Sequence, residues 1–215
     1  MFTSFHGGIG KSTIAERFAK NYQAQTRCSG AFLEMNLFSP SYIVEHLGLR
    51  DKLKNSFMDF FMSNWSGLRA EDLSDTFTEF EKLLIIPFTD VRSSEPLKPR
   101  FSFHETDAEF AMSRLLSCLS QKGSFVVIDL PLSFSSFPLF LLEKSDVIYY
   151  IYNSQPSSIK LAKRFLDDAA RSNSMKEKIS LIRNMAEMNV NIIDEAECRI
   201  WDKEFLVPMA QLSKP

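Results

Sequence analysis

Short apolar runs of strand length alternate along this chain with longer amphipathic segments, in which apolar residues recur at helical spacing. The apolar runs predict strands at residues 2–5, 31–36, 83–87, 125–129, 146–152 and 178–183. The amphipathic segments predict helices at residues 11–23, at residues 107–121 and from residue 156 onward. Strands and helices that alternate in this way are typical of an α/β fold, in which helices flank a mostly parallel central sheet.

The remaining segments are less regular. Residues 41–82 are rich in Phe, Met and Trp and are interpreted as irregular helix, whereas residues 92–100 are interpreted as a loop because Ser and Pro cluster there. Beyond residue 189 the pattern predicts little. With 215 residues in all, we expect a single domain over residues 1–215.

The composition of the chain argues against several classes of protein. The net charge of −2 produces no overall field that would attract nucleic acid or acidic lipid. The apolar runs fall well short of the ~20 residues of a membrane-spanning helix. The three cysteines form no pair-spaced metal motif, and their odd number argues against a disulfide framework. A cytoplasmic protein with reduced thiols is expected.

Glycine is scarce, with seven residues in the chain, and three of the seven stand at positions 7, 8 and 10. Small residues at a turn let consecutive backbone N–H groups point at phosphate oxygens, and the following helix adds the partial charge of its N-terminus. Lys11 would reach the β- and γ-phosphates of a nucleotide, and the Ser12 hydroxyl would bind Mg²⁺. The predicted phosphate-binding loop (P-loop) consists of His6, Gly7, Gly8, Ile9, Gly10, Lys11, Ser12 and Thr13. A glycine-rich turn that merely precedes a helix is the alternative.

Asp129 ends the most strand-like run of the chain, Phe125-Val-Val-Ile-Asp129. In a parallel sheet the carboxyl end of such a strand lies beside the P-loop, so this carboxylate would hold Mg²⁺ through water. Taken alone, an acidic residue at a strand end is equally compatible with a structural role. We expect Leu130-Pro131 to turn the chain away from the strand.

These motifs resemble those of the ParA/MinD superfamily of deviant-Walker-A ATPases. That family opens its loop with Lys-Gly-Gly-x-Gly-Lys-Thr, matched here by residues 6–12, and its later acidic strand has the form apolar-apolar-Ile-Asp-x-Pro, matched by residues 126–131. Residues 34–36, 83–87 and 146–159 give weaker matches, so the resemblance covers most of the chain. It implies a three-layer P-loop NTPase fold that binds ATP and Mg²⁺. An Asn-Arg pair that often contacts adenine in the family falls here on Arg183-Asn184 in reversed order, which makes Asn184 a candidate adenine contact.

The departures from the family pattern affect catalysis. His6 replaces the signature lysine that reaches the phosphates of the partner subunit, and an imidazole does not supply a fixed positive charge. Asn36 replaces the acid that orients the attacking water, and an amide cannot act as a general base. Glu34 keeps a carboxylate two residues earlier. With Lys11, Asn36 and Glu34 as catalytic candidates, weak hydrolysis is expected.

The resemblance further implies an ATP-dependent switch that closes as a homodimer and recruits a protein partner, in pilus or secretion assembly or in partition. The departures are similar to those of the CpaE/TadZ branch, which localises pilus-assembly machinery. Any recruitment to the inner face of the membrane or to a cell pole would then come through the partner.

Two alternatives stay open. One is a nucleotide-binding scaffold without hydrolysis. The other is a protein similar to bacterial tyrosine kinases, which the segment after Asn36 faintly resembles, although the last tyrosine is Tyr152 and no C-terminal tyrosine cluster follows. Basic residues between positions 160 and 183 allow non-specific DNA contact, but a solvated helix face is the favoured interpretation.

Overall fold

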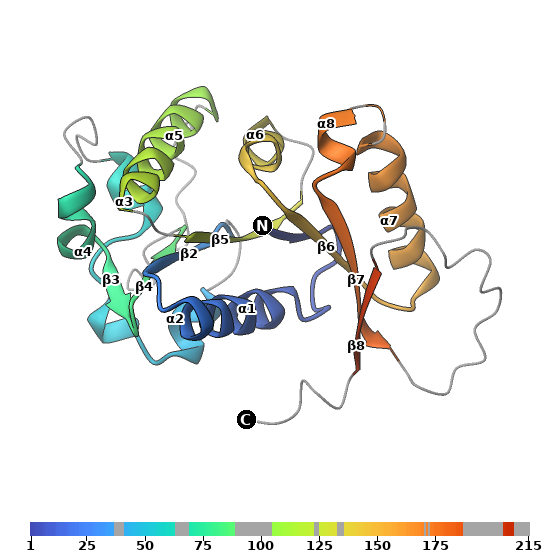
Figure 1. Cartoon of the computed structure of the whole chain (residues 1–215), viewed down its shortest axis with the longest axis horizontal. Helices are drawn as coiled ribbons and strands as arrows, with labels where there is room; N and C mark the ends of the chain where they lie inside the picture. The colour runs from blue at the N-terminus through green and yellow to red at the C-terminus, as the bar shows by residue number, and fades with distance from the viewer. Residues whose placement is uncertain are drawn as a thin grey trace.

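An eight-stranded sheet crosses the molecule, with strand order β3-β4-β2-β5-β1-β6-β7-β8 (Figure 1). The computed structural model describes residues 1–36, 41–62, 69–88, 105–122, 125–132, 136–169, 171, 173–186 and 204–208. Its strands are β1 (Phe2–Ser4), β2 (Gly30–Glu34), β3 (Thr78–Phe80), β4 (Leu83–Pro87), β5 (Phe125–Pro131), β6 (Ile148–Tyr152), β7 (Ile179–Ala186) and β8 (Glu204–Pro208). Neighbouring strands are parallel except for β3, which pairs antiparallel with β4.

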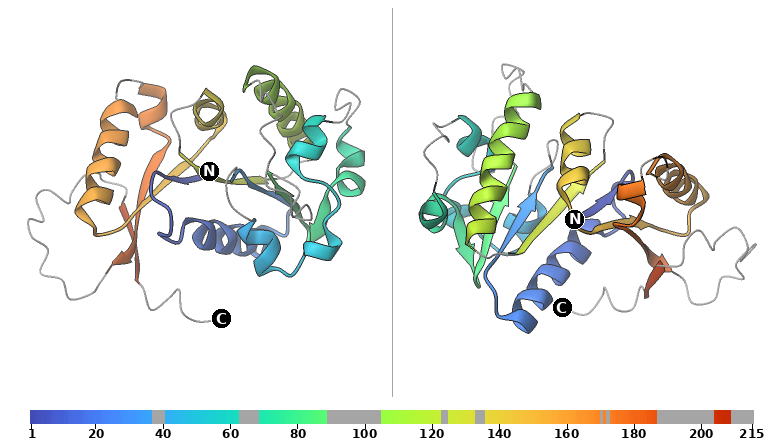
Figure 2. Two further views of the ribbon diagram at one scale, coloured as in Figure 1. Left: turned by 180° about the vertical axis from the view of Figure 1, so that it is seen from behind. Right: turned by 45° about the horizontal axis from the view of Figure 1, so that its top comes forward.

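Helices cover both faces of this sheet, which gives three layers (Figures 1 and 2). The longer helices are α1 (Lys11–Thr26), α5 (Glu105–Gln121), α6 (Ser136–Lys144) and α7 (Pro156–Ala169). The shorter ones are α2 (Tyr42–His46), α3 (Phe57–Met62), α4 (Leu73–Thr76) and α8 (Asn173–Lys176), with 3-10 turns at Arg50–Lys52 and Ala70–Asp72. Helices α1 and α2 lie on one face, and α3, α5, α6 and α7 lie on the other. The structure thus confirms the predicted α/β fold class.

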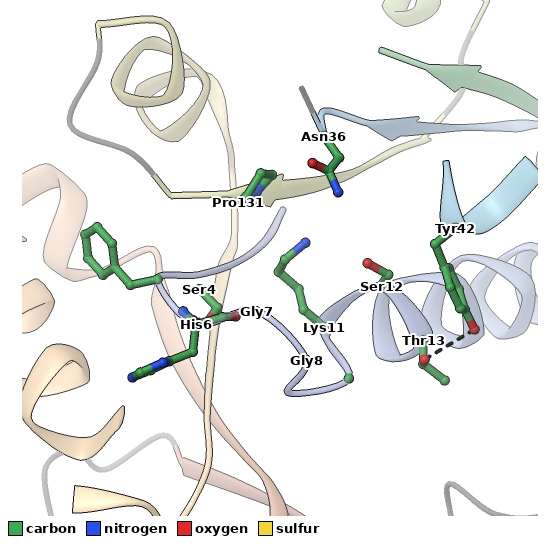
Figure 3. A pocket seen from close by; sticks show the side chains of 12 residues that line it. Ser4, His6, Gly7, Gly8, Lys11, Ser12, Thr13, Asn36, Tyr42 and Pro131 are labelled. Carbon is green, nitrogen blue, oxygen red and sulfur yellow. Dashed lines mark hydrogen bonds between the residues drawn. The ribbon is translucent and has the colours of Figure 1, made fainter. Parts of the chain in front are cut away.

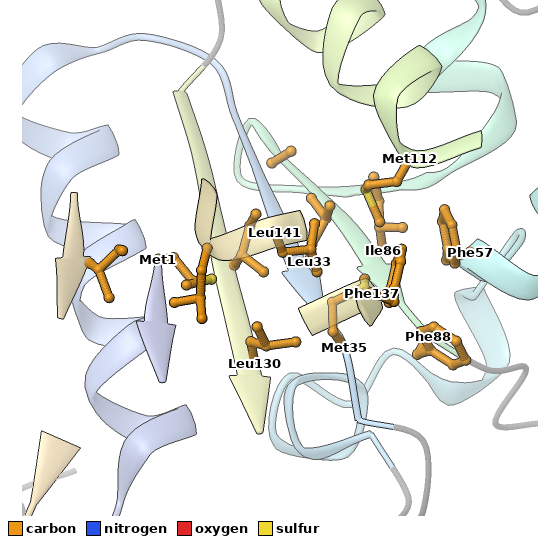
Figure 4. Close-up of a cluster of buried hydrophobic side chains, with 14 of the residues drawn as sticks. Met1, Leu33, Met35, Phe57, Ile86, Phe88, Met112, Leu130, Phe137 and Leu141 are labelled. Atoms are coloured by element: carbon orange, nitrogen blue, oxygen red, sulfur yellow. The ribbon is translucent and has the colours of Figure 1, made fainter. Parts of the chain in front are cut away.

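The two faces of the sheet carry separate apolar clusters, because successive side chains of a strand point to opposite faces. In β2, Phe32 packs with the cluster under α1 and α2, whereas Ala31 and Leu33 join the larger cluster on the opposite face. Figure 4 shows part of this larger cluster, where Leu33 and Ile86 lie near Phe137 and Phe57. Because both faces are buried, the strands are continuous apolar runs and not alternating ones.

The predicted strands and helices are present, with ends that shift by a few residues. Four elements of the described part were not predicted: the edge strand β3, helices α6 and α8, and strand β8. The expectation that Leu130-Pro131 turns the chain away was wrong, since β5 continues to Pro131, which pairs with Ser4 of β1. Residues 92–100, predicted as a loop, lie outside the described residues. No helix in the described part of the chain is long and apolar enough to cross a membrane.

Helix α2 is anchored to the sheet by a buried carboxylate. Glu34, at the end of β2, accepts hydrogen bonds from the backbone N–H groups of Tyr42 (2.8 Å) and Ile43 (3.2 Å) and from the hydroxyl of Ser41. Only 2% of Glu34 is exposed, and burial raises its pKa above the ordinary value of 4.5. The nearby negative charge of Asp129 raises the pKa of Glu34 further, while the bond from Ser41 opposes the shift.

This burial predicts a pH-dependent contribution to stability. Since the pKa of Glu34 is raised on folding, the folded protein holds this proton more tightly than the unfolded chain. The free energy of unfolding therefore falls as pH rises from about 4.5 through the pKa of folded Glu34. Glu34→Gln should remove that part of the fall, and Glu34→Ala should cost about 1–3 kcal/mol because buried N–H groups lose their acceptor.

Urea unfolding at a series of pH values measures both effects. The exposed Glu79 of β3 offers a matched control, and Glu79→Gln should keep the wild-type pH dependence. If the stability–pH curves of wild type and Glu34→Gln are parallel, Glu34 is not the source of the pH dependence.

Candidate functional site

A cavity of about 360 Å³ opens at the carboxyl end of β1, beside the N-terminus of α1 (Figure 3). Its volume falls within the range of small-molecule sites. The lining residues come from the predicted P-loop, from the ends of β1, β2 and β5, and from the start of α2: Ser4, Phe5, His6, Gly7, Gly8, Gly10, Lys11, Ser12, Thr13, Asn36, Tyr42 and Pro131. Residues far apart in the sequence thus meet where the strands of a parallel sheet end, which is the usual position of a ligand in open α/β folds.

The loop between β1 and α1 has a conformation that requires glycine. Gly8 and Gly10 have φ angles of 73° and 77°, in the left-handed region that side chains with a Cβ disfavour. Gly10 is also the N-cap of α1, and within this described segment the cap makes no side-chain hydrogen bond and the first turn holds no acidic residue. The first backbone N–H groups of a helix have no intrahelical acceptor. Here they face the cavity with the positive end of the helix dipole, an arrangement that suits phosphate.

Lys11 and Asp129 form an ion pair at the floor of this site. The side chain of Lys11 comes from the first turn of α1 and extends toward the end of β5, as Figure 3 shows beside Pro131. Asp129 is opposite Phe2 of β1 in the sheet register, and 1% of it is exposed. A buried carboxylate requires a partner, and Lys11 supplies the charge that balances it. The structure therefore brings together Lys11 and Asp129, which belong to the two most specific sequence motifs.

Ser12, Thr13 and Asn36 also line the cavity. In Figure 3 the Ser12 hydroxyl and the Asn36 amide lie on the same side of the loop as the Lys11 side chain. Among the described residues, no three His, Cys, Asp or Glu side chains are grouped so as to hold a metal ion by themselves. A Mg²⁺ ion here would therefore take its ligands from the Ser12 hydroxyl, from phosphate oxygens and, through water, from Asp129. The donor set fits a metal that arrives with a nucleotide.

His6 lies at the mouth of the cavity, but its ring does not point at the phosphate loop. Figure 3 shows the imidazole turned away from Lys11. The backbone N–H of His6 donates to Ser4 Oγ at 3.0 Å, and this hydroxyl donates to the His6 carbonyl at 3.2 Å. The Nε2 atom is buried and has no hydrogen-bond partner among the described residues. In this position His6 shapes the start of the loop and adds no charge near Lys11.

Four predicted site residues lie outside the cavity lining: Ile9, Asn184, Glu34 and Asp129, of which Asp129 is joined to the cavity through its ion pair with Lys11. Ile9 is buried in the apolar cluster under α1, so only its backbone belongs to the loop. Asn184, on β7, donates from Nδ2 to the carbonyl of Ile9 at 2.6 Å and is fully buried. Asn184 therefore supports the P-loop from the sheet, through the backbone carbonyl of Ile9. Glu34 uses its carboxylate to anchor α2, away from the cavity.

Sequence reasoning missed Tyr42, which lines the cavity from α2. Its hydroxyl accepts a hydrogen bond from Thr13 Oγ1 at 3.2 Å (Figure 3). No motif spacing pointed to it, because it lies in the segment 41–82 that was interpreted only as irregular helix. The structure brings it to the P-loop through the packing of α2 beside α1.

Comparison with known proteins identifies the fold. No protein-family model matches the sequence, and no curated protein matches it. Among solved structures, the chain is similar to a ParA family ATPase from Chlorobium tepidum TLS, with a TM-score of 0.70 and 16% identity over 98% of this chain and 85% of that one.

Two further structures agree. The MinD cell division protein of Aquifex aeolicus has a TM-score of 0.66 and 15% identity, covering 96% of this chain and 80% of its own. Cobyrinic acid a,c-diamide synthase from Mycobacterium smegmatis, solved with a bound ATP analog and magnesium, has a TM-score of 0.58 and 15% identity, covering 87% and 75%. With its P-loop and Asp129 at the ends of parallel strands, this chain has the fold of the ParA/MinD P-loop ATPases.

Proposed function

We propose that this protein is an ATP- and Mg²⁺-dependent switch of the ParA/MinD kind, which recruits or positions a partner complex and hydrolyses ATP weakly. The observation that carries the proposal is the cavity in which the left-handed glycines, the free start of α1 and the Lys11–Asp129 pair converge. The similarity to positioning and partition ATPases supports the general kind of function.

Each residue of the cavity has a task that its chemistry allows. The loop around Gly8 and Gly10 directs backbone N–H groups at the phosphates, and Lys11 neutralises charge on the β- and γ-phosphates. Bound Mg²⁺ would supply further charge neutralisation between these phosphates. Ser12 would hold that ion directly and Asp129 would hold it through water, while Lys11 would serve the phosphates.

Weak hydrolysis follows from the residues near the position of the terminal phosphate. Asn36 can hold a water by hydrogen bonding but cannot accept its proton. Glu34, the nearby carboxylate, accepts three hydrogen bonds at the start of α2 and does not line the cavity. His6 is turned away from Lys11. No described residue of the cavity therefore combines a free carboxylate with access to the attacking water.

The partner and the assembly are proposed from the family resemblance. ATP would close a homodimer across the two P-loops, and the dimer would bind a protein of a pilus, secretion or partition system, with the CpaE/TadZ kind as the favoured case. The protein would act in the cytoplasm and reach the membrane or a pole only through that partner.

A scaffold that keeps its nucleotide bound is the second candidate. The hydrogen bonding of Glu34 favours it, because a carboxylate committed to α2 leaves the site without a base. Turnover measured with and without a partner separates the two candidates: a switch is stimulated and a scaffold is not.

Lys11→Ala should weaken ATP binding a hundredfold or more, about 3 kcal/mol, because the phosphates lose the cation of the loop. Isothermal titration with ATP and Mg²⁺ measures this loss. Since the variant leaves Asp129 buried without its partner, Lys11→Ala/Asp129→Asn should be titrated beside it, with thermal unfolding as a check on folding. Lys163→Ala, on the exposed side of α7, is the control. Near-wild-type affinity in a folded Lys11 variant would exclude the P-loop site.

Asp129→Asn should separate the two roles of this carboxylate. The variant loses its hold on Mg²⁺ and also frees Lys11, so the affinity for ATP with Mg²⁺ should fall at least tenfold while the affinity in EDTA stays equal or rises. Titrations in the two buffers give the ratio. Asp167→Asn, on the exposed side of α7, should leave both values unchanged. Equal losses in both buffers would restrict Asp129 to a structural role.

The unmodified protein should hydrolyse ATP well below ~1 s⁻¹, the low end of ordinary enzyme rates. Restoring the family residues as His6→Lys with Asn36→Asp should raise the rate, since a correctly placed cation alone is worth about 10³-fold or more in such sites. Phosphate release under saturating ATP measures it, with size-exclusion chromatography to follow dimer formation. Brisk hydrolysis by the unmodified protein would refute this account and make Glu34 the working base.

A further inference from the structure

Tyr42 lines the cavity at the P-loop, although none of the family motifs includes this residue. It comes from α2, yet its side chain lines the same cavity as Lys11 and Ser12. Figure 3 shows the ring beside the start of α1, with its hydroxyl at Thr13. The bond runs from Thr13 Oγ1 to the Tyr42 oxygen at 3.2 Å. A phenol that accepts from one neighbour still has its own proton to donate to another.

Three separate contacts hold this tyrosine in place. Its backbone N–H donates to Glu34 at 2.8 Å. Its ring stacks on His46, with centroids 5.3 Å apart and planes 11° from parallel. Its hydroxyl contacts Thr13, which belongs to the P-loop itself. A side chain fixed at its backbone, ring and hydroxyl is preorganised, so little entropy is lost when it binds a ligand.

The phenol stays protonated and therefore remains a donor. Burial raises the pKa of Tyr42 above its ordinary value of 10, and the negative charge of Glu16 raises it further. Glu16 is also the carboxylate near enough to accept the phenolic proton. It is 4% exposed and is already paired with Lys20 at 2.7 Å and with His46 at 3.6 Å. Glu16 would thus stay compensated if the Tyr42 proton turned to a ligand.

The position of Thr13 indicates which part of a nucleotide lies within reach. Lys11, which serves the β- and γ-phosphates, extends toward Asn36 and Pro131. Tyr42 and Thr13 meet on the other side of Ser12, away from the Lys11 amine (Figure 3). With the β- and γ-phosphates at Lys11, a phosphate group held on this side would be the one next to the nucleoside.

We propose that Tyr42 is a nucleotide-binding residue, whose hydroxyl acts with Thr13 on the α-phosphate of the bound nucleotide. The inference rests on the proposed ATP-binding function and adds a contact to the same site. This contact also links α2 to nucleotide binding. Tyr42, which contacts the phosphate, donates its backbone N–H to Glu34, and Glu34 lies opposite Asp129 in the sheet register.

The test removes the hydroxyl alone. Tyr42→Phe keeps the ring, its stacking on His46 and the backbone bond to Glu34, so the fold should be unaffected in thermal unfolding. ATP and ADP should both bind roughly 10- to 150-fold more weakly by isothermal titration, since an α-phosphate contact serves both and one hydrogen bond to a charged group is lost. Tyr22→Phe removes the same hydroxyl from the far part of α1 and should bind both nucleotides like wild type.

A spectroscopic measurement identifies the phosphate. In ³¹P NMR of bound ADP, Tyr42→Phe should shift the α-phosphate resonance and leave the β-phosphate resonance nearly unchanged. Wild-type-like affinity of Tyr42→Phe, in a protein whose ATP binding depends on Lys11, would overturn the inference and leave the proposed function standing. A loss for ATP without a loss for ADP would also overturn it, because the contact would then be to the γ-phosphate. If wild type binds neither nucleotide, both proposals fail.

Discussion

The buried pair of Lys11 and Asp129 is the interaction on which the arrangement of the site depends. Asp129 lies in the middle of the sheet, paired on one side with β1 and on the other with β2, and an unpaired charge at this depth would be strongly unfavourable. Lys11 can reach it only if α1 begins directly above the end of β1. That start in turn requires the sharp loop that Gly8 and Gly10 allow. The same geometry that satisfies the aspartate also leaves the first N–H groups of α1 directed at the cavity.

A second buried carboxylate, Glu34, is engaged by helix α2 and does not line the cavity. Glu34 and Asp129 are neighbours in register across β2 and β5, so their negative charges oppose each other. One is balanced by a lysine, and the other by hydrogen bonds from the hydroxyl and backbone at the start of α2. Both carboxylates near the cavity are therefore committed to partners. The residue that does face the cavity at the end of β2 is Asn36, which has no proton-accepting group of comparable strength.

Support for the P-loop comes from one face of the sheet and from the sheet itself. On one face, Ile9 places the loop in the apolar cluster under α1, and Tyr42 contacts it from α2. From the sheet itself, Asn184 of β7 holds the carbonyl of Ile9. A loop fixed from several directions is preorganised for a ligand.

Features that depend on neighbouring residues could be predicted from the sequence, whereas features that depend on contacts between distant segments could not. The α/β class, the glycine-rich loop before α1 and the position of Asp129 on a buried parallel strand depend on local periodicity and on motifs of consecutive residues, so each could be predicted. The edge strand β3 and helix α6 could not, because β3 is a three-residue strand placed by its antiparallel pairing with β4, and α6 is apolar along most of its length and lacks an amphipathic pattern. Pro131 was misjudged for a similar reason, since its place in β5 is set by the neighbouring strand β1.

The site divides in the same way. Residue type and spacing identified Lys11, Ser12 and Asn36, which line the cavity. Only the tertiary structure decided that Glu34 serves α2, that Asn184 supports the loop, that the His6 ring turns away and that Tyr42 enters the cavity. These outcomes depend on which helix packs against which strand. The sequence pattern specifies that a residue lies at a strand end or on a helix, and the packing of separate elements determines which group its side chain meets.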